Sequence, residues 1–446
     1  MEKRFNVFQK QRAKTYQIII VCFLLLIFIG TILLCLPISA NNHAPTNFFD
    51  ALFTAVSASC VTGLVVKDTA THWSMFGQFI ILIMIQIGGM GVITVALTII
   101  SITGKKIGMM ERTTMQESVG APRARGIIRL TSFIIKTSLI IEAIGTVLLF
   151  PQFFKDFGLF KGIWYSIFHS ISAFCNAGFD LMGIRGPFSS FVSYNGNLLV
   201  NAVIMLLIVV GGIGFITWDD LKTNKFNFKK YSLQTKIILI ATIILIIVPS
   251  IYFFMFEYRG VRMPERILMS LFQSITCRTA GFNTSNIAAM DESGAFIMII
   301  LMLIGGCPGS TAGGMKTTTI AVLFLAAISV YQRKKEVQTH NRRISDDTIR
   351  GAGAILFMYL TVFILGAIII SRVEDLPLMS CLFESASAIG TVGLSFGITP
   401  SLGVISRLIL MLLMFLGRVG GLTLIYAAVP DDTSLLSKPL EKLSVG

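Results

Sequence analysis

The stretch from Phe53 to Leu64 reads FTAVSASCVTGL, and three later stretches repeat its pattern. They are FHSISAFCNAGF at 168–179, LFQSITCRTAGF at 271–282 and FESASAIGTVGL at 383–394. In each copy a short apolar segment leads into a glycine that Leu or Phe follows. The glycines are Gly63, Gly178, Gly281 and Gly393, spaced at intervals of roughly a hundred residues. This spacing predicts one structural unit that is used four times.

The copies also agree residue by residue. Copies one, two and four have Phe ten positions, Ser six positions and Ala five positions before the glycine. Copy three fits after a slip of one residue, with Phe272 and Thr276 in these places. The alternative is four buried helices that happen to end at a glycine cap. Because spacing and identity recur together, the repeat is the favoured interpretation.

The composition places these units in a membrane. Hydrophobic residues make up 54% of the chain and charged residues only 13%. Eight segments approach or exceed the roughly 20 apolar residues that cross a bilayer. They are Tyr16–Pro37, Phe76–Ile102, Ile127–Phe150, Asn197–Trp218, Ser232–Phe256, Ala295–Val330, Gly351–Ser371 and Leu402–Ala428. Each quarter of the chain therefore contributes two spans, and the repeated stretch lies between them.

The distribution of Lys and Arg predicts the orientation. Positive charge collects in the N-terminal arm and in the links that follow the first three quarters, at 105–129, 222–236 and 333–350. The positive-inside rule places all of these in the cytoplasm, with the four repeated stretches at the outer side of a cell membrane. Orientation and anionic lipid thus account for the net charge of +14, and binding of nucleic acid is not expected.

Parallel repetition predicts a pseudo-fourfold arrangement. Each pair of spans returns the chain to the same side, so four copies can surround one axis. The fold class is an all-α polytopic membrane protein with four parallel helix, pore loop, helix repeats around a central pore. The expected divisions are an arm (1–15), four pore repeats (16–104, 105–222, 223–335 and 336–430) and a C-terminal tail (431–446).

Each repeated stretch is predicted to be a half-helix that enters the bilayer and returns as an extended strand. Asp50, Pro264 and Pro377 stand at plausible helix starts. The strands would present rings of backbone carbonyls that replace the water shell of a monovalent cation such as K⁺. No Asp or Glu lies within them, which disfavours Ca²⁺. The residues expected to form this filter are Val61, Thr62, Gly63, Asn176, Ala177, Gly178, Thr279, Ala280, Gly281, Thr391, Val392 and Gly393.

With one glycine in each of four pore loops, the chain resembles the membrane subunit of the Trk, Ktr and HKT superfamily of potassium transporters, most closely the bacterial Ktr type. The resemblance covers essentially the whole chain. It implies K⁺ uptake through the carbonyl filter, a homodimer, and a cytosolic ring of RCK-type nucleotide-binding regulatory subunits. No cofactor is expected on this chain itself. Activation by Na⁺ is left open.

The third quarter contains a break in its second span. The run 305–314 is rich in Gly, Pro and small polar residues, which cannot hold a continuous helix. In the family a matching loop obstructs the path below the filter, so the resemblance assigns a gating role. The residues concerned are Gly305, Gly306, Gly309, Ser310, Thr311, Gly313, Gly314, Lys316 and Arg418. A passive kink remains the alternative. A nucleotide-binding loop is disfavoured because Met315 stands where that motif needs Lys.

Arg418 lies within the last span, where a cation is unfavourable unless it is paired or hydrated. We expect it to face the pore beside the gating loop, with snorkelling to the inner surface as the alternative. The glycines of the other second spans are interpreted as packing sites. The sequence also predicts that only the third quarter has a broken span, and that side chains alternate around the ring.

No arrangement of residues has the spacing of a catalytic site, so the chain is not expected to be an enzyme. Two rival functions stay open. One is a Na⁺- or H⁺-coupled transporter of another solute, for which Glu142 is the best buried carboxylate. The other is a membrane scaffold, which would not need glycine at four matched sites.

Overall fold

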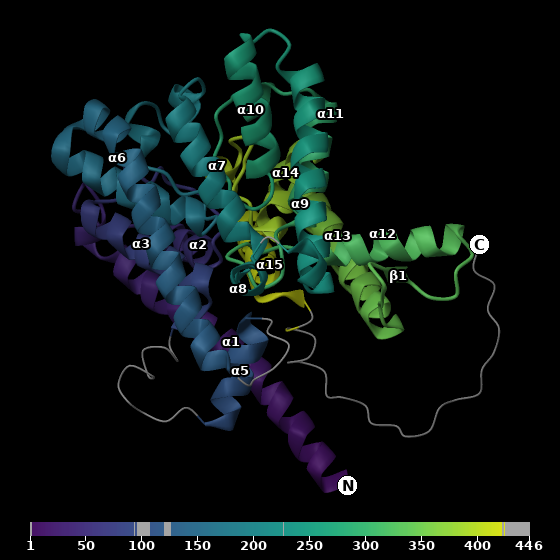
Figure 1. Cartoon of the computed structure of the whole chain (residues 1–446). Helices are drawn as coiled ribbons and strands as arrows, with labels where there is room; N and C mark the ends of the chain where they lie inside the picture. Colours follow the sequence, from purple (N-terminus) through teal and green to yellow (C-terminus); the bar gives the residue numbers. More distant parts are fainter. Residues whose placement is uncertain are drawn as a thin grey trace.

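The computed structural model describes residues 2–92, 94, 95, 108–119, 126–225, 227–421 and 423. It is helical apart from one short hairpin, and its helices follow one another in four consecutive groups (Figure 1). The basic side chains of residues 3–14 and those at 105, 106, 123 and 125 lie outside the described residues, as does the tail 431–446.

The first quarter consists of α1 (Glu2–Cys35), α2 (Phe48–Ser59) and α3 (Met75–Met90). The short helix α2 starts two residues before Asp50, because the side chain of Asn47 caps it by accepting a hydrogen bond from the Phe49 N–H at 2.9 Å. Asp50 therefore stands at the start of this helix, as predicted, although Asn47 and not Asp50 supplies the cap. Asp50 lies in the first turn, where its charge suits the helix dipole.

The second quarter follows the link helix α5 (Met109–Val119) and contains α6 (Ile127–Phe174), α7 (Leu198–Ile213) and α8 (Phe215–Asn224). Helix α6 combines a membrane span with the short pore helix of this quarter. Gly158 separates the two parts with a φ of 75°, a backbone angle that favours glycine.

The third quarter contains α9 (Leu233–Tyr252), a π-helical turn (Phe253–Glu257), α10 (Met263–Thr276), α11 (Glu292–Ile304) and α12 (Thr317–Tyr331). The strands β1 (Gln338–Thr339) and β2 (Arg342–Arg343) form an antiparallel hairpin after α12. The fourth quarter contains α13 (Asp346–Glu374), α14 (Leu378–Gly390) and α15 (Val404–Val419). As predicted, a proline stands at the start of each pore helix here, Pro264 in the first turn of α10 and Pro377 at the cap of α14.

In the described residues, six single 3₁₀ turns connect these helices. They are Pro37–Ser39, Met182–Ile184, Val192–Tyr194, Phe228–Lys230, Ile287–Ala289 and Thr399–Ser401.

The eight predicted spans are of two kinds. In the described residues, the first span of each quarter belongs to one long apolar helix: Tyr16–Cys35, Ile127–Phe174, Leu233–Glu257 and Asp346–Glu374. The second spans stop early. Helices α3, α7, α11 and α15 have 16, 16, 13 and 16 residues, or roughly 20 to 24 Å, less than the ~30 Å hydrocarbon core.

Each second span ends at a glycine with a left-handed backbone. The glycines are Gly91, Gly214, Gly305 and Gly420, with φ of 88°, 103°, 67° and 88°. At Gly214 the chain bends by 92° between α7 and α8. The expectation that only the third quarter is broken was therefore wrong, since all four spans break in the same register.

The glycines three positions earlier are packing sites. A Cβ at Gly88, Gly211 or Gly417 would overlap the carbonyl oxygen near the end of the pore helix of the same quarter, at Ser59, Phe174 and Ile389. These glycines allow the second span to lie directly against the pore helix.

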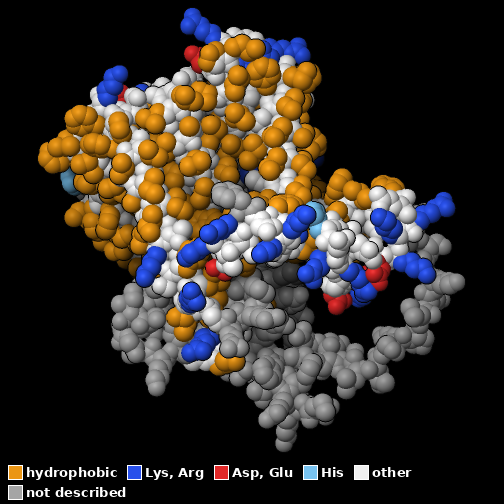
Figure 2. Space-filling view, viewed as in Figure 1, with side chains coloured by type: hydrophobic (Ala, Val, Ile, Leu, Met, Phe, Trp, Pro, Cys, Tyr) orange, Lys and Arg blue, Asp and Glu red, His pale blue; other side chains and the backbone are white. Residues whose placement is uncertain are grey.

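The outer faces of the long helices are apolar and exposed. At most a third of each of the four long apolar windows is buried inside the protein. Figure 2 shows this as a wide hydrophobic face, with Lys and Arg gathered at its borders. An apolar surface of this extent requires lipid, whereas the buried core surrounds the four pore helices.

Candidate ion pathway

The four repeat glycines meet in a closed ring. A Cβ added at Gly63 would come within 3.0 Å of the Ala177 carbonyl oxygen. The same holds for Gly178 against Ala280, for Gly281 against Val392, and for Gly393 against Thr62. Each glycine thus faces the residue that precedes the next glycine, in the order one, two, three, four and back to one. All twelve residues predicted for the filter belong to the four loops that form this Gly ring.

The backbone has the same unusual conformation in all four loops. The ring glycines have φ between 69° and 96°, and the residues two positions earlier, Val61, Asn176, Thr279 and Thr391, have φ of 57°, 58°, 77° and 50°. The residue between them is not left-handed in any copy. Alternating handedness turns successive carbonyls toward one side, unlike the alternating carbonyls of a regular strand. A left-handed Val or Thr is an outlier, and such strain collects at functional sites.

Hydroxyl groups from the pore helices hold these loops in place. In copies one and four the Gly63 and Gly393 N–H groups donate to Ser57 Oγ and Ser387 Oγ at 3.1 and 3.0 Å. In copies two and three the hydroxyl of the corresponding pore-helix residue instead donates to the carbonyl of the residue that follows the glycine. These bonds join Ser172 to Phe179 and Thr276 to Phe282, both at 2.6 Å.

The four copies therefore form two pairs that are neighbours in the ring. Copies one and four adjoin, and so do copies two and three, where the Asn176 amide and the Thr279 hydroxyl form a hydrogen bond at 3.1 Å. The expectation that side chains alternate around the ring was wrong, because it ignored the order in which the loops meet.

A polar residue at one matching position of three pore helices forms hydrogen bonds with the chain just beyond the ring. His169 Nε2 accepts from the Leu181 N–H at 3.0 Å. Glu384 accepts from Ser395 Oγ, the Phe396 N–H and Thr399 Oγ1 at 2.6 to 3.0 Å. Gln273 accepts from Tyr258 Oη and Ser285 Oγ at 3.4 and 3.5 Å. The sequence analysis missed Gln273, although the one-residue slip of copy three places it beside the other two.

The inner loop, residues 305–316, lies on the other side of the ring. It begins and ends at α11 and α12 and contains left-handed Gly305, Gly309 and Gly314. A Cβ at Gly313 would overlap the Thr391 side chain, so this part of the loop lies directly against the fourth pore loop.

Hydrogen bonds to backbone carbonyls join the inner loop to two other quarters. The Thr311 hydroxyl donates to the Phe174 carbonyl at 3.0 Å, and the Gly314 N–H donates to the Gly417 carbonyl at 3.0 Å. These bonds hold the loop to both the second and the fourth quarter beneath the ring.

Two cations lie at this inner level. Arg418 donates to the carbonyls of Thr311, Gly88 and Gly89, the last at 3.0 Å, and so connects the fourth, third and first quarters. Lys316 donates to the Ala312 carbonyl at 2.9 Å within the inner loop. Both line an inner cavity of about 290 Å³. Arg418 is therefore held by carbonyls of the inner loop and of the end of α3.

The sequence of this chain matches a family of ion transporters, as expected from this geometry. Residues 3–436 match the TrkH model, described as a cation transport protein. The chain belongs to the TrkH family of cation transport proteins. Membership confirms the resemblance drawn from the four glycines, and it makes the chain a multi-pass membrane transporter and not an enzyme.

Individual relatives cover nearly the whole chain. The "Potassium/sodium uptake protein NtpJ" of Enterococcus hirae is 37% identical over 427 residues, which is 94% of this chain and 93% of the relative. The "Ktr system potassium uptake protein B" of Bacillus subtilis is 38% identical over 429 residues, 95% of each chain. The crystal structure of the potassium transporter TrkH from Vibrio parahaemolyticus aligns with a TM-score of 0.73 and 19% identity. That alignment covers 94% of this chain and 85% of the other.

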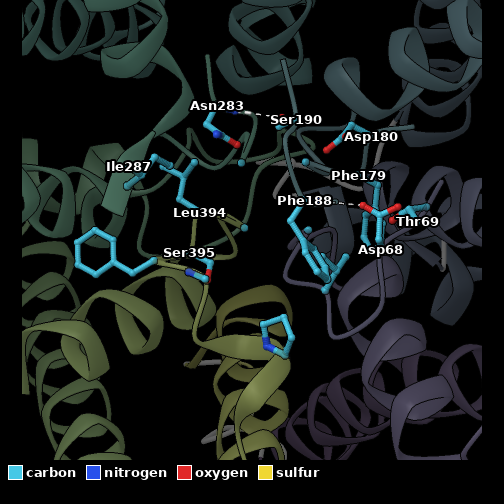
Figure 3. A pocket seen from close by; sticks show the side chains of 18 of the residues that line it. Asp68, Thr69, Phe179, Asp180, Phe188, Ser190, Asn283, Ile287, Leu394 and Ser395 are labelled. Atoms are coloured by element: carbon cyan, nitrogen blue, oxygen red, sulfur yellow. Dashed lines mark hydrogen bonds between the residues drawn. The ribbon is translucent and has the colours of Figure 1, made fainter. Parts of the chain in front are cut away.

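An acidic vestibule lies outside the ring. It has a volume of about 380 Å³, and the four ring glycines are among the residues that line it. Asp68 and Asp180 lie at its side (Figure 3), and none of its lining residues is Lys or Arg. Asp68 accepts from the Phe188 N–H at 2.9 Å and so holds the 180–190 segment in place. Without a lining cation beside them, Asp68 and the ionised form of Asp180 attract positive ions to the mouth of the ring.

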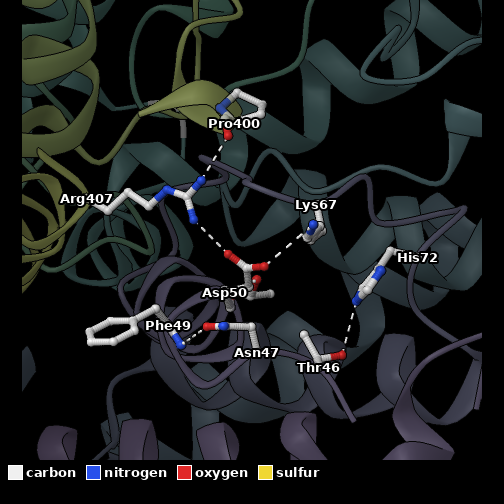
Figure 4. A network of polar contacts seen from close by, with 9 residues as sticks. Thr46, Asn47, Phe49, Asp50, Lys67, His72, Pro400 and Arg407 are labelled. Carbon is white, nitrogen blue, oxygen red and sulfur yellow. Dashed lines mark hydrogen bonds and ion pairs between the residues drawn. The ribbon is translucent and has the colours of Figure 1, made fainter. Parts of the chain in front are cut away.

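Asp50 joins the first and last quarters of the chain. Its carboxylate pairs with Arg407 at 2.7 Å and with Lys67 at 3.5 Å (Figure 4). Arg407 also donates to the Pro400 carbonyl at 2.9 Å. Asp50 and Arg407 are 357 residues apart, and only 13% and 19% of their side chains are exposed. This ion pair fixes α2 against α15, where the ring closes.

We expect Arg407→Gln to destabilise the protein by about 2 kcal/mol, because it leaves the largely buried Asp50 carboxylate with only the ion pair to Lys67, whose side chain is 45% exposed. Thermal unfolding of the detergent-solubilised chain measures this. In the double variant Asp50→Asn/Arg407→Gln, part of the loss should be recovered. Strictly additive losses from the two single variants would show that the pair does not couple the two quarters.

A pH dependence is expected from Asp180. Burial, and secondly the charge of Asp68, raise the pKa of Asp180 from its ordinary 3.8 to about 7. The carboxyl group is therefore neutral below about pH 7 and negative above it. Uptake of ⁸⁶Rb⁺ at a subsaturating concentration should rise about threefold from external pH 6 to pH 8. Asp180→Asn should remove this rise, and an unchanged pH profile in that variant would exclude Asp180 as its source.

Proposed function

We propose that this chain takes up K⁺ across the cell membrane through the Gly ring, which acts as a carbonyl-lined selectivity filter. The observation that carries the proposal is the closed ring itself, with four left-handed glycines each packed against the carbonyl of the next loop. Such a ring offers several oxygens at one level, and these can replace the hydration shell of a monovalent cation.

The surroundings of the ring support this chemistry. Helices α2, α6, α10 and α14 all end three to five residues before their ring glycine, so the negative ends of four helix dipoles lie near the ion. Side chains of the loops carry no carboxylate, as the sequence analysis noted. The transported ion would therefore be held by uncharged oxygens, which favours a monovalent cation over Ca²⁺.

The inner loop is proposed as the gate. It lies against Thr391 of the ring, and Arg418 joins it to the end of α3. A guanidinium group at this level repels a cation that has passed the ring. Passage therefore requires the loop and Arg418 to move away from their carbonyl partners.

The family relatives support a wider assembly. One relative is a Ktr system potassium uptake protein and another is named for both potassium and sodium. We include in the proposal a homodimer, a cytosolic RCK-type regulatory ring and a cytoplasmic N-terminus. Na⁺ is proposed as an activator or a second transported ion.

Coupled transport of another solute finds less support. Both carboxylate oxygens of Glu142 accept from Gln86 Nε2, at 2.9 and 3.0 Å. Glu142 is 4% exposed and does not line the vestibule or the inner cavity. It is therefore outside the path that the ring defines.

Gly281→Ser tests the filter. The added side chain would collide with the Val392 carbonyl and distort the ring, so the preference for K⁺ over Na⁺ should fall roughly tenfold or more in a liposome flux assay. Gly351→Ser is a matched control, since a Cβ there meets nothing within 4 Å. Unchanged selectivity in folded Gly281→Ser protein would contradict the filter assignment.

Arg418→Gln tests the gate. Loss of the guanidinium removes both the repulsion and the links to Thr311 and Gly88, so basal ⁸⁶Rb⁺ flux in liposomes should rise roughly tenfold. Deletion of 309–313 should have the same effect. Arg372→Gln, at an exposed position near the end of α13, should leave the flux unchanged. A closed pore in both gate variants would favour a passive kink.

A further inference from the structure

A basic groove lies at the N-terminal end of α9, away from the ion pathway. Its volume is about 1240 Å³, and it is formed by the end of α8, the turn Phe228–Lys230, the start of α9 and the hairpin. Five of its lining residues are cations, and none is Asp or Glu. The cations are Lys229, Lys230, Lys236, Arg342 and Arg343.

The charge of this groove is uncompensated within the described part of the chain. Arg343 pairs with Glu336, but no ion pair is found for the other four cations. The nearby carboxylate of Asp220 accepts from the Ser232 N–H at 2.9 Å and from Asn224. Lys236 also lies in the second turn of α9, near the positive end of the helix dipole. An anion in the groove would relieve the mutual repulsion of these cations.

The walls of the groove are fixed by packing. His340 and Asn341 both have positive φ and form the two-residue turn that pairs Thr339 with Arg342. Beneath the hairpin, Val337 and Ile344 pack with Val322 and Leu233. Phe228 lies against His340 with ring centroids 6.3 Å apart. The groove is thus a built feature and not a chance gathering of mobile side chains.

The groove continues into a lipid-facing surface. Lys236 lies on the same face of α9 as a stripe of exposed apolar residues. These follow Lys236 at helical spacing, by four, seven, eight, eleven and fifteen residues. These residues are Ile240, Ile243, Ile244, Ile247 and Ile251, which are 39 to 57% exposed. From Lys236 to Ile251 the helix rises roughly 22 Å, more than the ~15 Å depth of one leaflet's hydrocarbon. Figure 2 shows Lys and Arg side chains gathered directly below the hydrophobic face.

We propose that this groove binds the headgroup of an anionic diacyl phospholipid, whose acyl chains lie along the apolar stripe of α9. The phosphate would lie among Lys229, Lys230, Lys236 and Arg342, and basic pockets at the cytoplasmic ends of membrane helices bind such headgroups. A groove of about 1240 Å³ has room for more than a lone phosphate, so a phosphoglycerol headgroup fits within it. Continuity with the stripe favours lipid over an acidic protein segment or a soluble anion.

The test uses the purified full chain in detergent, titrated with 1-palmitoyl-2-oleoyl phosphatidylglycerol and followed by native mass spectrometry. The variant Lys229→Gln/Lys230→Gln/Arg342→Gln should weaken binding tenfold or more. The control Arg333→Gln/Lys334→Gln/Lys335→Gln removes the same charge from exposed residues after α12 that do not line the groove. It should change binding less than twofold. Thermal unfolding confirms that both variants are folded.

Two further arms separate the sources of the anion. Phosphatidylcholine with the same acyl chains should bind at least tenfold more weakly, because its headgroup has no net charge. Inorganic phosphate and glycerol 3-phosphate at millimolar concentration should not displace the bound lipid. Equal weakening in both triple variants would show attraction by diffuse charge and would overturn the site. Displacement by the soluble anions would overturn the assignment to lipid.

Discussion

The rest of the structure depends on the close approach of four backbones at the Gly ring. The position that a Cβ would take at each glycine is occupied by the carbonyl oxygen of the next loop. No other residue can satisfy this contact without moving its neighbour, so the four loops constrain one another. The short pore helices follow from it, since each must end before its glycine so that the non-helical loop can reach the axis. The glycines of the second spans follow as well, because those spans lie against the ends of the pore helices.

The ring is strained, and its surroundings must hold it. Val61, Thr279 and Thr391 are β-branched residues in left-handed conformation, which costs about 1 to 2 kcal/mol each. Hydrogen bonds from the loop to the pore helix offset this strain. The N–H groups of Thr62, Ala177 and Val392 each donate at 2.8 Å to the carbonyl of Ser57, Ser172 and Ser387. The serine that recurs six residues before the glycine thus has two roles, because its carbonyl and its hydroxyl both bind the loop.

This explains how much of the site could be predicted from the sequence. The four pore loops and their glycines were identified because strain restricts the residues allowed there and makes the copies alike. The breaks at Gly91, Gly214 and Gly420 were missed, since a glycine within an apolar run is tolerated in a helix and does not by itself predict a break. The order of the loops and the Asp50–Arg407 pair depend on tertiary contacts between distant quarters, which no local pattern encodes. Gln273 could have been found by applying the slip of copy three consistently.

The inner level presents backbone carbonyls, as the ring does, but here they bind the guanidinium of Arg418. Arg418 is held entirely by backbone carbonyls in the described contacts, and two of these belong to Gly88 and Gly89 in the last turn of α3. Carbonyls at a helix end favour a cation, and without it the Gly88 carbonyl keeps only its bond from the Gly91 N–H, at 3.2 Å. Under the proposed gating role, a transported cation would be stabilised by the same oxygens, so that it and the guanidinium would be mutually exclusive occupants of this level. On this proposal, the free energy of opening would be reduced by what the arriving ion gains from the carbonyls that Arg418 releases.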